Sequence, residues 1–191
     1  AAGAWSDDIA ATISLRLPIR TMVLQMLLST PGPLVLKPVI GAVSRQLSLK
    51  QLPGGEFFLG GGWPGDPAED RLTYTMRDES VRSGWDAAVG LLPAVSEQRI
   101  ARQWCGLEAE CFDGVPLIGP APGFDGLTLA VGFSGHGFAL CPAVGRAVAD
   151  QLAGLPTLEL DMLDPSRMAS FDPDAVERFI SAPPSERLLA G

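Results

Sequence analysis

The sequence predicts a mixed α+β fold built largely on an antiparallel sheet. Strand-like apolar runs come first along the chain, then one long amphipathic helix, then further strands. The last regular stretch is a strand, a glycine-rich turn and a helix. The 191 residues are 47% apolar, enough to bury a core, and 22 glycines and 17 prolines scattered along the chain indicate many turns.

The composition limits the classes of binding partner and the cellular compartment that we expect for this protein. A net charge of −8 without a basic cluster argues against nucleic acid and against an anionic membrane. The cysteines Cys105, Cys111 and Cys141 show no CxxC spacing, so we expect no metal site, no disulfide framework and a reducing, cytoplasmic location. Residues 126–145 are uncharged, but glycines, polar residues and Pro142 interrupt them too often for a membrane span.

The first predicted elements are a short helix and a long strand. Ser6 can cap the helix, because Asp7 and Asp8 then lie in its first turn and face the positive helix end. The apolar stretch 17–31 predicts a strand that Pro31 closes.

A loop, a hairpin and the clearest helix follow. Prolines make residues 31–41 irregular, and 45–62 predict two strands around the turn 53–55. Residues 75–93 predict a helix that ends at Pro93. Its apolar face comprises Val81, Trp85, Ala88, Val89 and Leu92.

The second half of the chain predicts three more strands and two helices. Residues 99–112 and 115–119 are expected to be strands around a turn, and 126–133 a short buried strand. Pro142 suits the first turn of a helix that runs to about Ala153. Its expected core face is Val144, Val148 and Leu152; a further amphipathic helix is expected around Val176, Phe179 and Ile180.

The stretch 132–146, GFSGHGFALCPAVGR, is the main candidate site because it holds the only histidine, His136, among three glycines. From the residues alone, a structural histidine and a ligand-facing turn are equal alternatives. GFSGH differs from the hydrolase motif GxSxG at its fifth position, which disfavours a hydrolase. The GGGWPG segment at 60–65 matches GxGxxG, but no helix follows it, so it is interpreted as a hairpin end.

Three segments in order resemble the D-amino-acid oxidase / sarcosine oxidase family of flavoproteins. They are AAGAWSDDIA at the start, WCGLEAECFDGVPLIGPAP at 104–122, and GFSGHGFALCPAVGRAVADQLAG at 132–154. The resemblance covers residues 1 to about 155, and residues 25–41 and 51–62 look like substrate-domain strands of the sarcosine oxidase β-subunit-like branch.

The resemblance implies an FAD enzyme that oxidises the C–N bond of an amine or amino acid by hydride transfer to the flavin. It implies no particular catalytic residue. The residues implied to lie along FAD are Ala2, Gly3, Ala4, Trp5, Gly132, Phe133, Ser134, Gly135, His136, Gly137 and Phe138. The implied domains are an FAD-domain segment (1–14), a substrate-binding domain (15–100), a return to the FAD-binding domain (101–155) and a tail (156–191).

The chain departs from the family pattern in the second segment. Glu108 stands where the family has an arginine, and Cys111 and Phe112 replace its Thr-Pro pair. The acidic replacement weakens the case for a simple amino-acid substrate. Cys105 falls one position away from the cysteine that binds flavin covalently in some members, so no covalent link is expected.

The family's N-terminal strand and its GxGxxG loop would precede Ala1, so the FAD-binding domain implied here is incomplete. A truncated chain, a gene fragment and a natural subunit completed by another chain are the alternatives. Each implies weak or absent FAD binding by the chain alone, and association with an N-terminal half, a partner subunit or a second copy. The competing function is a non-catalytic binding or assembly subunit of the same fold.

Overall fold

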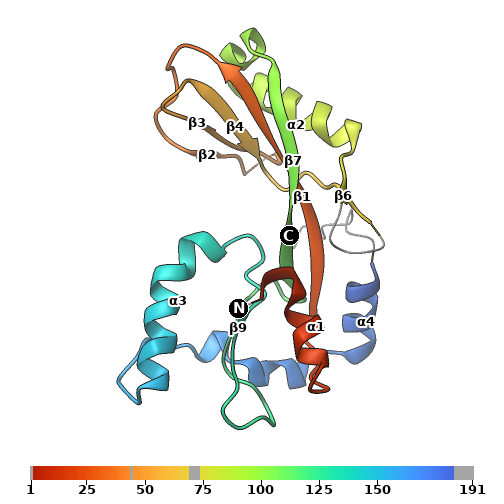
Figure 1. Cartoon of the computed structure of the whole chain (residues 1–191), viewed down its shortest axis with the longest axis vertical. Coiled ribbons are helices and arrows are strands. Elements are labelled where there is room, and N and C mark those ends of the chain that lie inside the picture. Colours follow the sequence, from red (N-terminus) through yellow and green to blue (C-terminus); the bar gives the residue numbers. More distant parts are fainter. Residues whose placement is uncertain (1, 44, 69–73, 183–191) are drawn as a thin grey trace. The chain divides into compact units, whose positions relative to one another are not determined.

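The computed structural model describes residues 2–43, 45–68 and 74–182 (Figure 1). They form two compact units: residues 2–22 with 107–182, and the described residues between 23 and 106. The chain passes from one unit to the other inside strand β1 (Ile19–Pro31) and again inside β7 (Ile100–Cys111). The domain boundaries expected from the sequence, 14/15 and 100/101, remain a prediction.

The second unit is built on a five-stranded sheet that includes β1 and β7. The strand order is β2-β3-β4-β1-β7, with β2 (Ile40–Gly41), β3 (Ser48–Gln51) and β4 (Glu56–Gly60). The pairs β2–β3, β3–β4 and β1–β4 are antiparallel, which confirms the largely antiparallel α+β class and the predicted β3–β4 hairpin. Two short strands, β5 (Asp66–Pro67) and β6 (Tyr74–Thr75), pair separately.

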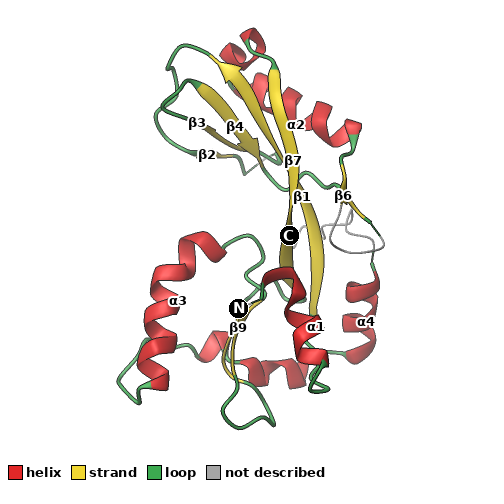
Figure 2. Ribbon diagram, viewed as in Figure 1, coloured by secondary structure: helices red, strands yellow, loops and turns green. Residues whose placement is uncertain are grey.

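Helix α2 (Asp78–Leu91) packs against one face of this sheet (Figure 2). Ala88 is buried, and the other four residues of the predicted apolar face pack around the same core, so the helix prediction is confirmed. A 3₁₀ turn, η2 (Pro93–Glu97), follows where the proline ends the helix. The buried core comprises Leu27, Leu47, Leu49, Phe57, Leu59, Ala88 and Val95.

The first unit begins with a 3₁₀ turn, η1 (Gly3–Trp5), that leads into helix α1 (Ser6–Ala11). The expected cap at Ser6 is wrong, because Trp5 is the N-cap residue and Ser6 is already helical. The Ser6 hydroxyl instead donates to the Gly3 carbonyl at 2.8 Å, since the chain is already turning there. Asp7 lies in the first turn as predicted, and accepts the Leu17 N–H at 2.9 Å.

Strands β8 (Leu117–Pro120) and β9 (Thr128–Val131) form an antiparallel pair. Both strands were predicted, but β8 belongs with β9 in a separate two-stranded sheet, whereas β7 lies in the large sheet. The buried core of this unit comprises Ala10, Leu15, Leu17, Ile19, Ala109, Cys111, Leu117, Ala121, Leu129 and Val131.

Helix α3 (Gly137–Leu152) begins five residues earlier than predicted, so Pro142 lies inside it rather than in its first turn. Proline has no N–H for the Phe138 carbonyl, and the Cys141 thiol donates to that oxygen at 3.2 Å instead. The predicted core face is only partly correct. Val144 and Ala147 are buried, whereas Leu152 is 69% exposed.

The C-terminal residues of the first unit form η3 (Asp161–Leu163), η4 (Pro165–Ser170) and helix α4 (Pro173–Ser181). The amphipathic helix predicted here is confirmed, with Phe179 on its buried side. Asp172 caps it by accepting the Asp174 N–H at 3.2 Å. Across the described residues, no helix has the length and apolar character needed to cross a membrane.

Candidate functional site

The turn between β9 and α3 has an unusual backbone. Gly132, Ser134 and Gly135 all have positive φ, at 71°, 50° and 87°, and Ser134 is not a glycine. Such a conformation costs a non-glycine residue about 1 kcal/mol or more. The Ser134 hydroxyl offsets this cost, because it accepts the Cys111 N–H at 3.0 Å and donates to the Gly132 carbonyl at 3.1 Å. The turn is therefore fixed rather than loose.

The glycines of this turn serve two different purposes. A Cβ on Gly132 would lie 3.1 Å from the Cys111 side chain, and a Cβ on Gly137 would lie 3.3 Å from that of Phe133. These two glycines are required by packing within the unit. Gly135 is exposed, and a Cβ there would meet only the Glu108 carboxylate, at 3.4 Å. Its backbone is therefore open to a ligand.

The N-terminus of α3 is uncapped. His136 is the N-cap residue, its side chain makes no capping hydrogen bond, and the first turn contains no acidic residue. The first N–H groups of the helix thus present partial positive charge. His136 is exposed and Phe138 is 96% exposed, so this positive end lies at the surface of the unit.

The other group of predicted site residues, in and next to η1, lies against the same strand, β1, as the β9–α3 turn. The Ala4 carbonyl accepts the Thr21 hydroxyl at 3.1 Å, and Ala4 is buried. Ile19, two residues earlier on β1, packs beside Gly132. Residues i and i+2 of a strand are about 7 Å apart, so β1 holds both predicted segments at one end of the strand.

These features suit a flat ring on which negative charge develops. Gly3 has φ of 58° and no atom within 4 Å of a Cβ placed on it, so its backbone is as open as that of Gly135. Trp5 is 41% exposed beside it. Ala2, Gly3, Trp5, Gly135, His136 and Phe138 present surface to a ligand, whereas Ala4, Gly132, Phe133, Ser134 and Gly137 shape the backbone behind it. Flavin contact by either set remains a prediction.

A charged network joins the turn that follows β7 to η4. Arg167 donates to the Asp113 carboxylate at 2.9 Å and to the Val115 carbonyl at 2.6 Å. Burial tends to raise the pKa of Asp113, but hydrogen bonds from Arg167, Val115 and Cys111 outweigh it and hold that pKa below its ordinary value. Burial raises the pKa of the Cys111 thiol to about 12. The sequence offered no signal for this network, since Arg167 is 54 residues from Asp113.

A second network, also missed, buries an arginine on β1. The Arg20 guanidinium lies 2.8 Å from the Glu110 carboxylate and 4.4 Å from the Phe179 ring centroid. Phe112 packs edge-on against Phe179 at 5.6 Å between centroids. Only 4% of the Arg20 side chain is exposed, so this pair fixes α4 against the strands of the first unit.

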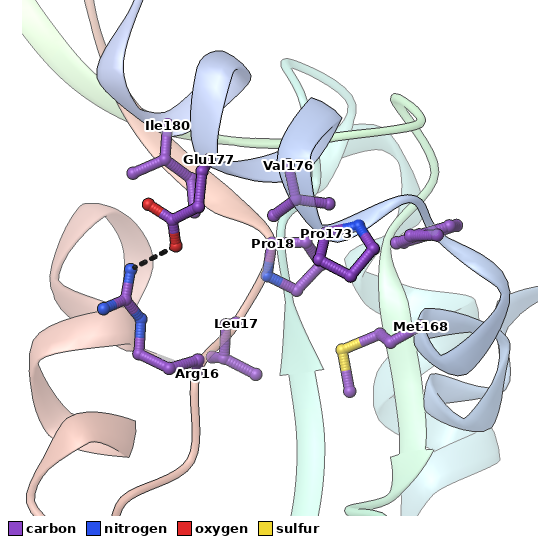
Figure 3. Close-up of a pocket in the computed structure, with 9 residues that line it drawn as sticks. Arg16, Leu17, Pro18, Met168, Pro173, Val176, Glu177 and Ile180 are labelled. Atoms are coloured by element: carbon purple, nitrogen blue, oxygen red, sulfur yellow. Dashed lines mark hydrogen bonds and ion pairs between the residues drawn. The ribbon is translucent and has the colours of Figure 1, made fainter.

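A pocket of about 250 Å³ lies between the start of β1 and α4 (Figure 3). Apolar side chains dominate its lining, and the Arg16–Glu177 pair crosses it at 3.5 Å. Both charged side chains are more than 60% exposed, so the pair contributes little. None of the predicted site residues lines it. The lining residues are Arg16, Leu17, Pro18, Met168, Phe171, Pro173, Val176, Glu177 and Ile180.

The geometry argues against two other chemistries, a serine hydrolase and a reactive cysteine. Ser134 directs its hydroxyl hydrogen to a backbone carbonyl, so it is not prepared as a hydrolase nucleophile. Cys105 is buried, and burial is the main reason that its pKa rises to about 11. A thiol with that pKa is protonated at neutral pH and is a poor nucleophile.

Comparison with known proteins identifies the class. Residues 1–151 match the family described as FAD dependent oxidoreductase (DAO), and the chain belongs to this family. It is 32% identical over 154 residues to glycine oxidase from Pseudomonas aeruginosa, covering 81% of this chain and 41% of that protein. It is 29% identical to sarcosine oxidase subunit beta from Rhodobacter capsulatus, covering 78% of this chain and 35% of that protein.

Two solved enzyme structures have a similar fold. L-proline dehydrogenase from P. horikoshii superposes with a TM-score of 0.79 at 28% identity, over 89% of this chain and 46% of that one. Glycine oxidase from Geobacillus kaustophilus gives a TM-score of 0.74 at 21% identity, over 87% of this chain and 44% of that one, and supports the fold alone. The chain therefore spans less than half the length of these relatives.

Proposed function

We propose that this chain supplies the flavin-ring side and the substrate side of an FAD-dependent oxidoreductase that oxidises the C–N bond of an amine or amino acid. The observation that carries the proposal is the fixed β9–α3 turn, where the open backbone of Gly135 leads into the uncapped helix N-terminus at His136. FAD, when bound, supplies the redox chemistry. The chain's own contribution is to hold the ring and to place partial positive charge beside it.

The names of the relatives support the substrate class. Glycine oxidase, sarcosine oxidase and L-proline dehydrogenase are named for small amino acids or N-alkyl amino acids.

The proposal also includes a partner for the ADP end of FAD. The GxGxxG match at 60–65 spans the end of β4 and a bridge at Pro64. The next helix among the described residues is α2, which begins only at Asp78, so the match is not followed directly by a helix that could cradle a pyrophosphate. The relatives include a protein named as a subunit, sarcosine oxidase subunit beta. We expect an N-terminal FAD-binding half, a partner subunit or a second copy to complete the cofactor site.

The alternative is a binding or assembly subunit that keeps the fold without the redox reaction. The exposed Phe138 on α3 favours it, because an exposed aromatic side chain is typical of an interaction surface. In that case the β9–α3 turn would contact protein instead of FAD.

Flavin fluorescence during titration with the 191-residue chain separates the two functions. We expect quenching that Gly135→Leu weakens by at least about tenfold, because the new side chain occupies the ligand's place. Gly123→Leu is the matched control, since Gly123 is also exposed, with φ of 79° and no atom within 4 Å of its Cβ position. Because weak binding is expected of the chain alone, the titration extends to high protein concentration. Equal quenching by both variants, or none by the unmodified chain at that concentration, would contradict the proposal.

A further inference from the structure

The pocket between the start of β1 and α4 combines an apolar interior with one pair of opposite charges (Figure 3). Among its lining residues only Arg16 and Glu177 are charged, and the others are apolar. All of them belong to the first unit. The pocket volume of about 250 Å³ is below the roughly 300–1,000 Å³ of sites for drug-sized ligands, so it suits a small molecule with one apolar group.

The apolar walls of the pocket are held by packing behind them. Leu17 is only 1% exposed and belongs to the buried core of the first unit, and Met168 packs against the same core. The Phe171 ring lies 5.2 Å from that of Phe112, which also packs edge-on against Phe179 of α4. The pocket is therefore preformed, and a ligand does not have to order its walls on binding.

The charged pair across the pocket is oriented but weak. Arg16 Nη2 lies 3.5 Å from Glu177 Oε1, and both side chains are mostly exposed. The Asp7 carboxylate, which accepts the Leu17 N–H, lies 4.0 Å from Arg16 Nε, so it faces the other edge of the guanidinium. Because an exposed ion pair contributes little, Arg16 and Glu177 can separate at small cost to admit a ligand between them.

This arrangement matches the chemistry of a free amino acid. A guanidinium presents planar donors that suit a carboxylate, and the Glu177 carboxylate suits an ammonium group. A ligand that bears both charges on one carbon can pair with both residues at once. An apolar ligand with only one charge would pair with one residue and face a like charge on the other.

We propose that this pocket binds a free apolar α-amino acid as its zwitterion. The carboxylate of the ligand pairs with Arg16, its ammonium group pairs with Glu177, and its side chain fills the apolar interior. The ligand thereby links the segment before β1 to α4. The inference goes beyond the proposed function and does not depend on it, since none of the residues predicted to contact flavin lines this pocket.

L-Leucine is the probe, and the methionine methyl signals in nuclear magnetic resonance spectra of the 191-residue chain follow its binding. The chain has five methionines, so these spectra are simple. Met168 lines the pocket, whereas Met162 lies outside it and is 83% exposed. The Met168 signal is assigned from its loss in Met168→Leu. We expect leucine to shift it saturably and to leave Met162 unchanged, and glycine, which lacks the apolar group, to shift neither.

Two leucine analogues, crossed with two variants, test the charges separately. Isocaproate lacks the ammonium group and isopentylamine lacks the carboxylate. Glu177→Gln should weaken leucine and isopentylamine about three- to fivefold and leave isocaproate no weaker. Arg16→Gln should weaken leucine and isocaproate by the same factor and leave isopentylamine no weaker. Arg178→Gln is the matched control, because Arg178 is an exposed cation of α4 that does not line the pocket. Matching melting temperatures show that folding is unaffected.

Absence of a saturable Met168 shift with leucine overturns the inference. Isocaproate or isopentylamine that binds as tightly as leucine does so too, because the pocket would then take an apolar group with a single charge. Equal leucine affinity in Arg16→Gln, Glu177→Gln and Arg178→Gln contradicts the pairing of the zwitterion. These measurements contain no flavin, so a failed flavin titration with a positive leucine result contradicts the proposed function and leaves the amino-acid site standing.

Discussion

Ser134 is the residue on which the geometry of the candidate site depends most. Its hydroxyl holds a left-handed residue in place by bonding Cys111 and Gly132. Ser134→Ala leaves the Cys111 N–H without this acceptor, and we expect it to lower the free energy of unfolding by about 1–3 kcal/mol. Ser134→Gly loses the same bonds but relieves the backbone, so it should cost about 1 kcal/mol less.

Urea unfolding measures both changes, with Ser96→Ala as the control. Ser96 is exposed and makes only a local bond, to Pro93 at 2.8 Å, so its loss should change stability little. A glycine variant less stable than the alanine variant would show that strain at Ser134 is absent.

Asp113 links the stability of the first unit to pH. Its pKa in the folded protein lies below the ordinary value of 3.8, because the bonds from Arg167 and its neighbours outweigh burial. A depressed carboxylate pKa stabilises the fold above the unfolded-state pKa, and the contribution is lost as pH falls through the folded-state value. Stability should therefore decline below about pH 4.

Asp113→Asn should lower the free energy of unfolding at pH 7 by about 2 kcal/mol and flatten its acid dependence, since Arg167 loses a charged partner. Chemical unfolding at a series of pH values tests this, with the exposed Asp125→Asn as the control. An acid profile of Asp113→Asn that parallels the unmodified chain would contradict the assignment.

Neither charged network could have been predicted from the sequence, because each joins residues far apart in the chain. Arg20 and Glu110 are 90 positions apart, and Arg167 and Asp113 are 54 apart. The predicted site residues, in contrast, were found from a local signal in the sequence. Residues 132–138 stood out locally, as glycines around one histidine, and the structure divides them into residues that are open and residues that pack.

At the scale of elements, local periodicity predicted most of the fold. The strand ending at Pro31, the β3–β4 hairpin and α2 all follow from alternation or helical spacing. The errors arose where a local rule competed with another interaction. Pro142 suggested a helix start, but α3 begins at Gly137 and a thiol occupies the carbonyl that proline leaves open.

Pro142 also supports a prediction for α3. Pro142→Ala restores the missing N–H to the Phe138 carbonyl, so the free energy of unfolding should rise by about 1–3 kcal/mol. Thermal unfolding followed by circular dichroism measures it. Pro122→Ala, in an exposed turn, is the control, and no gain is expected there. An unchanged or lower melting temperature for Pro142→Ala would show that Pro142 does not destabilise α3.

For the whole molecule, the proposed function divides FAD between this chain and a second component. The chain belongs to the FAD-dependent oxidoreductase family over residues 1–151 and spans less than half of its relatives. Its open glycines and uncapped helix suit the ring of the cofactor. Among the described residues, no helix follows the GxGxxG match directly to hold the ADP end.

The most direct test of this division is competition against FAD bound to the 191-residue chain, measured by recovery of flavin fluorescence polarisation. We expect riboflavin to displace FAD at similar concentrations and ADP to leave it bound, because the chain recognises the ring end. Displacement by ADP but not by riboflavin would disprove this division of FAD and would place the nucleotide, not the flavin ring, on this chain.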